Sequence, residues 1–287
     1  MSDQAGAIGV FDSGHGGLTV WRALQTRLPE QRFLYLGDHA NAPYGEHRPE
    51  EILAMTRAGV ERLFELDCRL VVLACNTAAA VALRRLQEDW LPGRPGRRIL
   101  GIFVPTVEAL TGVAWAVDHP ERQVRPEDPR RGIAVFATTR TVESGAYGRE
   151  IRRRAPGFTV AEVACPGLVA AIEGGAPAEE LAGMVSGFCR TLAQRMAAPE
   201  AVVLGCTHFP LVAAQFRAAL PENAPILSQA ALSAESLAGY LLRHPEFAVP
   251  GGGTRFLTTG DPRRIAPRAS ALLGESFAFE AAGAGLP

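Results

Sequence analysis

The chain has 287 residues, of which 47% are hydrophobic and 21% are charged, and its formal net charge is −1. This length suits one large α/β domain or two smaller lobes, and the composition is that of a globular protein. The near-neutral charge gives no indication of nucleic-acid binding or of binding to a membrane surface.

The cysteine count and the absence of lysine exclude further classes of protein. Residues 1–7 show no secretion signal, and the apolar stretch 70–83 is too short to span a bilayer. The odd number of cysteines, five, therefore indicates reduced thiols in a cytoplasmic protein rather than a disulfide framework. The spacing of cysteine and histidine does not suit a zinc site, so we expect no metal. All 29 basic residues are arginine. A pyridoxal phosphate enzyme needs a lysine, so that cofactor is excluded and we expect none.

Strands and helices alternate along the chain. An apolar strand at 7–11 leads into a glycine-rich turn at 12–17 and an amphipathic helix at 18–28, which is how a doubly wound α/β fold begins. The same analysis predicts strands at 33–36, 70–74, 99–104, 133–136, 158–164, 201–205, 225–227 and 255–257. It predicts helices at 49–66, 78–86, 107–117, 168–173, 178–196, 211–220, 234–244 and 262–273, a helix ending near 154, and a loop at 119–131.

Two segments of the sequence are near-repeats. Residues 70–77 and 201–208 each contain a β-branched apolar run, a small residue, a cysteine and polar residues, and a helix follows each. The two halves of the chain therefore resemble a duplication. We expect an α/β fold of two pseudo-symmetric doubly wound lobes, residues 1–104 plus 212–287 and residues 105–211. Ligands of open α/β sheets bind beyond the carboxyl ends of the strands, so Cys75 and Cys206 are expected on opposite walls of one active-site cleft.

Two opposed thiols suggest a specific reaction. A cysteine between a strand end and a helix N-terminus is favoured as thiolate, and neighbouring amide and hydroxyl donors suit a carboxylate ligand. Two acid/base groups on opposite sides of one carbon can remove a proton from one face and return one to the other, which inverts the stereocentre. The alternative is that Cys75 and Cys206 are buried only as small hydrophobic residues.

Other residues also have simpler explanations. Asp12 could merely cap the turn that follows it, and Tyr44 could be a surface turn residue. His208 alone could be a structural histidine. The glycines at 14–17 resemble part of a dinucleotide-binding fingerprint, but Thr19 stands where its third glycine belongs.

Six motifs, in order, are similar to those of the glutamate racemases in the cofactor-independent aspartate/glutamate racemase superfamily. The resemblance covers nearly the whole chain. The motifs are at residues 11–18, 37–45, 74–78, 137–147, 205–211 and 258–261.

This resemblance implies roles for individual residues. Cys75 and Cys206 would be the opposed acid/base pair, with Asp12 assisting Cys75 and His208 assisting Cys206. Glu173 matches a carboxylate near the second cysteine, although Ala170-Ala171 stand where the family usually has Pro-Leu. The implied substrate-site residues are Asp12, Ser13, Tyr44, Gly45, Asn76, Thr77, Thr138, Thr141, Thr207 and His208.

The resemblance also implies a substrate and a setting. The reaction would convert L-glutamate to D-glutamate, a peptidoglycan precursor, and family members are commonly homodimers. Ser228-Gln229 replaces a usual acidic segment and Arg140 replaces a frequent glycine. Two other functions remain open: a racemase for aspartate or another acidic amino acid, and a non-catalytic two-lobed amino-acid binding protein. The presence of both cysteines favours an enzyme, because a binding protein needs neither thiol.

Overall fold

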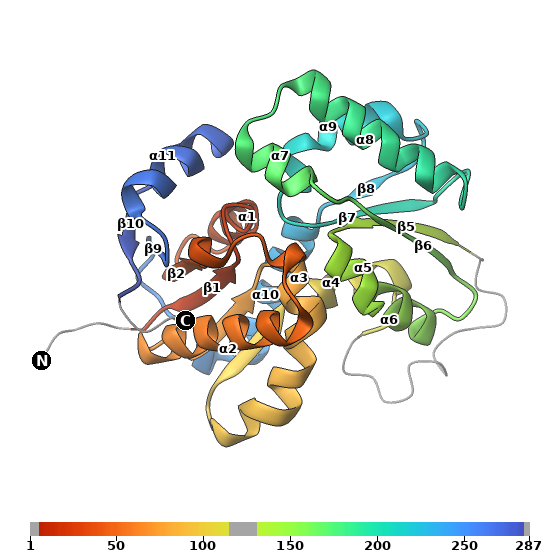
Figure 1. Ribbon diagram of the computed structural model, residues 1–287. Helices are drawn as coiled ribbons and strands as arrows, with labels where there is room; N and C mark the ends of the chain where they lie inside the picture. The colour runs from red at the N-terminus through yellow and green to blue at the C-terminus, as the bar shows by residue number, and fades with distance from the viewer. Residues whose placement is uncertain (1–5, 115–130, 284–287) are drawn as a thin grey trace, which may run out of the picture.

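The computed structural model describes residues 6–114 and 131–283. They form two α/β lobes, each built on a parallel sheet with helices on its faces (Figure 1). The first sheet has the order β10-β9-β2-β1-β3-β4, and its strands are β1 (Ile8–Asp12), β2 (Phe33–Gly37), β3 (Leu70–Leu73), β4 (Arg98–Gly101), β9 (Thr254–Thr258) and β10 (Phe279–Ala281). The second has the order β6-β5-β7-β8, and its strands are β5 (Gly132–Ala137), β6 (Thr159–Ala164), β7 (Ala201–Gly205) and β8 (Ile226–Leu227).

Helices connect the strands, as a parallel sheet requires. The α-helices are α1 (Leu18–Arg27), α2 (Pro49–Glu65), α3 (Asn76–Ala78), α4 (Phe103–Thr111), α5 (Thr139–Ser144), α6 (Ala146–Arg154), α7 (Leu168–Gly174), α8 (Ala178–Ala193), α9 (Ala213–Ala219), α10 (Gln229–Arg243) and α11 (Pro262–Leu273). The π-helical segments η3 (Ala79–Leu83) and η4 (Leu86–Trp90) continue α3. Short 3-10 helices are η1 (His39–Asn41), η2 (Tyr44–Glu46), η5 (Leu91–Gly93), η7 (Phe209–Val212) and η8 (Pro245–Phe247).

The strand order confirms the predicted two-lobed architecture. Four strands of the first sheet follow the order β2-β1-β3-β4, and the second sheet repeats it as β6-β5-β7-β8. β3 is therefore the counterpart of β7, and the cysteine that follows each strand lies at an equivalent position. Because the named strands of each sheet pair in parallel, their carboxyl ends lie at one edge of the sheet.

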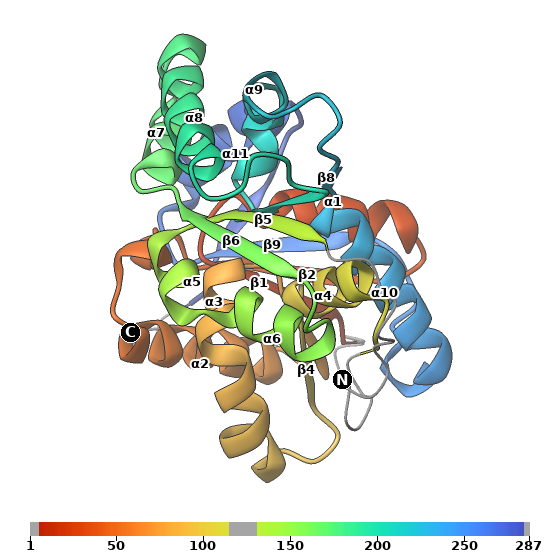
Figure 2. The ribbon, with the colours of Figure 1, turned by 90° about the vertical axis from the view of Figure 1, so that its right-hand side faces the viewer.

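Three apolar cores hold this arrangement. α1, α10 and α11 cover one face of the first sheet, where Ile8 and Val10 point. α7, α8 and α9 cover the outer face of the second sheet (Figure 2). The third core contains Phe11 of β1, Val135 of β5 and Ile151 of α6, so it belongs to both lobes. This shared core joins the lobes below the edge where the strands end.

The structure corrects three sequence predictions. Residues 103 and 104 belong to α4 rather than to a strand, because Pro105 lies in the first turn of that helix, where no helical hydrogen bond from its nitrogen is needed. β8 pairs with β7 and α9 packs on α8, so the second lobe continues past residue 211. β10 was not predicted. The predicted loop 119–131 lies almost entirely outside the described residues. Residues 115–117 of the helix predicted at 107–117 and residues 1–5 also lie outside them.

In the portions of the chain that the structure describes, no helix has the length and apolar character needed to cross a membrane.

Candidate active site

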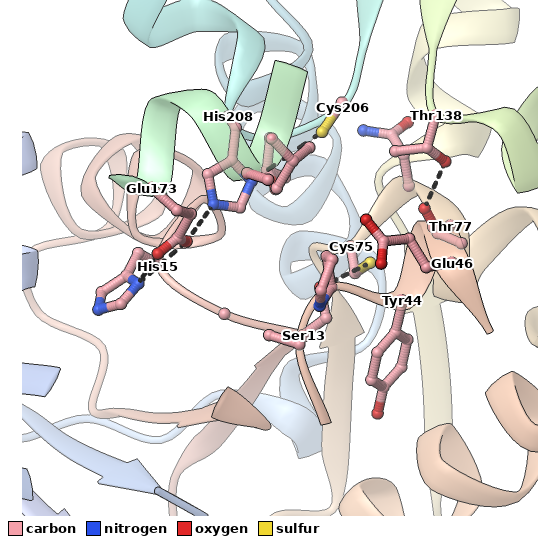
Figure 3. Close-up of a pocket in the computed structure, with 18 of the residues that line it drawn as sticks. Ser13, His15, Tyr44, Glu46, Cys75, Thr77, Thr138, Glu173, Cys206 and His208 are labelled. Atoms are coloured by element: carbon pink, nitrogen blue, oxygen red, sulfur yellow. Dashed lines mark hydrogen bonds and ion pairs between the residues drawn. The ribbon is translucent and has the colours of Figure 1, made fainter. Parts of the chain in front are cut away.

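A cavity of about 360 Å³ lies where the strand ends of the two lobes face each other. Both Cys75 and Cys206 line it, and Figure 3 shows them on different sides of the space. The other predicted site residues in its wall are Ser13, Tyr44, Gly45, Asn76, Thr77, Thr138, Thr207 and His208. The structure thus brings together residues from both near-repeats in one cavity.

Cys75 lies between β3 and α3 and is 4% exposed. Its Sγ accepts a hydrogen bond from the backbone N–H of Ala78 at 3.4 Å and lies 3.5 Å from Oγ of Ser13. Burial, and then the negative charge of Asp12, raise the pKa of Cys75 to about 12. At neutral pH this cysteine therefore holds its proton and is an acid.

Asp12 lies behind the cavity wall rather than in it, and it is fully buried. Its carboxylate accepts hydrogen bonds from the backbone N–H of Gly14 at 2.8 Å and from Oγ1 of Thr207 at 3.2 Å. Burial raises the pKa of Asp12, although the charge of His208 and these hydrogen bonds oppose the shift. Asp12 thus connects the turn after β1 to the segment after β7. Asp12 itself does not line the cavity.

His208 lies between Cys206 and a carboxylate. Its Nδ1 is 4.0 Å from Sγ of Cys206, and its Nε2 is 2.6 Å from Oε1 of Glu173 (Figure 3). Burial lowers the pKa of His208, but the hydrogen bonds to Cys206 and Glu173 outweigh it and raise the pKa to about 10. Burial raises the pKa of Glu173, but the hydrogen bonds from His15 and His208 hold it well below its usual value. An imidazolium–carboxylate pair therefore stands beside Cys206.

Two histidines of the first lobe complete this cluster, and the sequence analysis did not find them. Nδ1 of His15 is 2.8 Å from Oε2 of Glu173, so the carboxylate has two imidazole partners. His39 meets His15 edge-on at 4.4 Å between ring centroids. Burial, and then the charge of His15, lower the pKa of His39 to about 3, so its ring is neutral. The sequence signal for His15 was its place in the glycine-rich turn beside Asp12.

Three threonine hydroxyls join the lobes at the other end of the cavity. Oγ1 of Thr77 lies 3.0 Å from that of Thr138 and 3.3 Å from that of Thr141, and the last two are 3.0 Å apart. Thr77 and Thr138 line the cavity, whereas Thr141 is fully buried behind them. Thr141 therefore supports the wall from behind, and its predicted contact with the substrate stays a prediction.

The loop after β2 closes one side of the cavity. The Tyr44 hydroxyl donates a hydrogen bond to Oδ2 of Asp38 at 2.6 Å, so this phenol is occupied away from the cavity (Figure 3). A Cβ at Gly45 would lie 2.9 Å from Cβ of Thr138, so glycine permits this loop to approach the second lobe. Glu46 is exposed and lies in the cavity wall, and the sequence analysis did not select it.

The wall can bind a small charged amino acid. It offers a hydroxyl from Ser13, an amide from Asn76, the His208 imidazolium and two thiols. Among residues 6–114 and 131–283, no three His, Cys, Asp or Glu side chains are arranged to hold a metal ion.

Comparisons with known proteins identify the relatives of this chain. The model of the Asp/Glu/Hydantoin racemase family matches residues 19–237. Glutamate racemases from Cereibacter sphaeroides and Paracoccus denitrificans are 49% and 48% identical over 277 residues, which is 96% of this chain and 100% of each relative.

Solved structures give the same result. The glutamate racemase isoform RacE1 of Bacillus anthracis superposes with a TM-score of 0.83 at 27% identity, over 99% of this chain and 100% of that one. The glutamate racemase of Thermus thermophilus, solved with beta-chloro-D-alanine, has a TM-score of 0.75 at 32% identity over 98% of each chain. The chain therefore belongs to the Asp/Glu/Hydantoin racemase family.

Proposed function

We propose that this protein interconverts L- and D-glutamate without a cofactor, with Cys75 and Cys206 as the acid and the base. The observation that carries the proposal is the placement of the two thiols. They follow equivalent strands of the two lobes, and both line one cavity. The relatives named glutamate racemase, which match this chain over nearly its whole length, support glutamate as the substrate.

The proposed reaction balances without an outside reagent. One cysteine, as thiolate, takes the proton from the α-carbon, and the electron pair of the C–H bond passes to the α-carbon and its carboxylate. The opposite cysteine, as thiol, gives its proton to the other face of that carbon. The two cysteines exchange protonation states, and proton exchange with solvent restores them before the next turnover in the same direction.

The two thiols have different environments. The pKa of Cys75 is raised to about 12, so we propose that Cys75 is a thiol in the resting enzyme. Cys206 has the His208 imidazolium beside it.

The weak acidity of the α-C–H bond is the main difficulty. Hydrogen bonds that strengthen as negative charge develops on the substrate carboxylate lower this barrier. Ser13 and Asn76 supply such donors in the cavity wall. Thr207 donates its hydroxyl hydrogen to Asp12, which fixes the Thr207 side chain in the wall before substrate arrives.

Circular dichroism of L-glutamate tests the proposal. The signal should decay to zero with the purified protein and no added pyridoxal phosphate, and in D₂O the α-hydrogen should exchange with solvent. L-Aspartate, followed in parallel, should lose its signal far more slowly. An unchanged L-glutamate signal at micromolar protein would overturn the proposal. Loss of the L-aspartate signal would then favour a racemase for another acidic amino acid, and no loss of either signal would favour the binding-protein alternative.

We also propose that the D-glutamate product supplies peptidoglycan synthesis in the cytoplasm and that the enzyme is a homodimer. Light scattering coupled to gel filtration measures the oligomeric state.

A further inference from the structure

The side chains of Asn76, Tyr147 and Gln229 form a closed ring of hydrogen bonds behind the cavity wall. Asn76 of α3, Tyr147 of α6 and Gln229 of α10 are buried, as is Thr106 of α4. Nδ2 of Asn76 donates to Oε1 of Gln229 at 3.0 Å, and the Tyr147 hydroxyl donates to Oδ1 of Asn76 at 2.7 Å. Nε2 of Gln229 donates to the Tyr147 oxygen at 2.6 Å and to Oγ1 of Thr106 at 3.0 Å.

The direction of every hydrogen bond in this ring follows from one hydroxyl. Thr106 has a single hydroxyl hydrogen, which it donates to the backbone carbonyl of Ile102 at 3.0 Å. Its oxygen must therefore accept from Gln229, so the amide nitrogen of Gln229 faces Thr106 and its oxygen faces Asn76. The orientation of the Gln229 amide, which is ordinarily ambiguous, is fixed by this requirement.

The same logic extends to Asn76. Because Gln229 donates to the Tyr147 oxygen, the Tyr147 hydrogen is directed to Oδ1 of Asn76. Burial raises the pKa of Tyr147 above its ordinary value, so the hydroxyl keeps this proton. The ring uses one hydrogen of Asn76 Nδ2 and leaves the other, and Asn76 also lines the cavity beside Cys75.

We propose that Gln229 is a positioning residue for racemisation: held by Thr106 and Tyr147, it orients the Asn76 carboxamide so that one amide N–H serves the substrate carboxylate. This inference rests on the proposed function and assigns a task to a residue in a segment where the sequence departs from its family. Gln229 also links the lobes, because its ring joins α3 of the first lobe to α6 of the second.

The test is a double-mutant cycle on the full chain. Gln229→Met keeps the volume but removes the amide, and it should raise KM for glutamate about tenfold with a smaller change in kcat, as expected when a hydrogen bond to a charged group is disturbed. In the Asn76→Ala background the same substitution should change KM by less than about twofold, because its effect passes through Asn76. An equal rise in both backgrounds, or no rise in the native background, overturns the proposal.

A second variant and a control complete the design. Tyr147→Phe removes only the hydroxyl that donates to Asn76. It should raise KM as Gln229→Met does, and this rise should be lost in the Asn76→Ala background. This variant decides the question if Gln229→Met does not fold. Gln87→Met removes an amide that donates to the Ile99 carbonyl at 2.8 Å, away from Asn76, and should leave KM unchanged.

Calorimetric titration with D-glutamate separates this inference from the proposed function. If the native chain binds D-glutamate but does not racemise it, the proposed function fails and the same cycle is decided by Kd. If the native chain neither binds nor racemises glutamate, both are overturned.

Discussion

Oε1 of Glu173 lies 2.6 Å from Nε2 of His208, and the other ring nitrogen of His208 faces Sγ of Cys206 at 4.0 Å. The carboxylate therefore acts on the thiol through the imidazole. Cys75 has a different set of neighbours, Ser13 and the backbone N–H of Ala78. The two lobes share a strand order, yet the two cysteines have unlike electrostatic surroundings.

Removal of the Glu173 charge should change the pH dependence of the reaction. The pKa of His208 is raised to about 10 by Cys206 and Glu173, so in Glu173→Gln it should fall, and the imidazolium should be lost at lower pH. The alkaline limb of the kcat/KM profile should therefore move to lower pH, and kcat/KM at pH 8 should drop by about a hundredfold. An alkaline limb that stays where it is in the variant contradicts the pairing of Glu173 with His208.

Each cysteine of the pair should be indispensable for racemisation. Cys75→Ala and Cys206→Ala should each lower kcat by a factor on the order of 10³, measured by circular dichroism of L-glutamate. Each variant should still eliminate a β-leaving group from one enantiomer of a suitable analogue, because the remaining thiol can remove the α-proton from one face. Cys189→Ala, which alters a cysteine in the outer core of the second lobe, should keep full activity. Near-native racemisation by either single variant means that the two-base model is wrong.

Gly16 should be intolerant of any side chain. A Cβ there would overlap Oγ1 of Thr207 and lie 2.6 Å from Nδ1 of His208, so Gly16→Ala must push the segment after β7 away from the first lobe. We expect kcat/KM to fall at least about tenfold, as a displacement of catalytic groups by a fraction of an ångström does. Gly183→Ala is the matched control, because a Cβ at that exposed position of α8 meets nothing within 4 Å. Equal activity of the two variants argues against this close approach of the lobes.

Gly59 should matter for stability rather than for chemistry. A Cβ on this residue of α2 would overlap Cε2 of Phe11 and lie 2.8 Å from its Cδ2, in the core that both lobes share. Gly59→Ala should lower the free energy of unfolding by about 1–3 kcal/mol through overpacking. Gly183→Ala should raise it by about 0.5–1 kcal/mol, because alanine is the better helix residue. Urea denaturation measures both, and a stabilised Gly59→Ala variant would show that α2 can move away from β1.

Much of the fold was predictable because its signals are local. Apolar runs that end in polar or glycine-rich turns identified β1, β3 and β7, and the order of elements gave the parallel α/β class. The strand predicted at 99–104 failed in its second half because apolar residues of α4 are buried in a helix as fully as in a strand. β8 is two residues long, so only its pairing with β7 shows to which lobe it belongs.

The site was only partly predictable. The motifs include Cys75, Cys206 and His208, which line one cavity, and also Asp12 and Thr141, which lie behind its wall. A motif shows which residues belong to a turn, whereas the direction of each side chain depends on the lobe that faces it.

The sequence by itself determined the two matched strand-end cysteines, the alternating α/β order and, through the absence of lysine, the exclusion of pyridoxal chemistry. These are properties of short segments or of composition, so they need no knowledge of distant contacts. Only the tertiary structure decided that His15 and His208 share Glu173, and that Gln229 holds Asn76. Those partners come from different helices and turns far apart in the chain, and burial and hydrogen-bond geometry select them only when the two lobes are packed together.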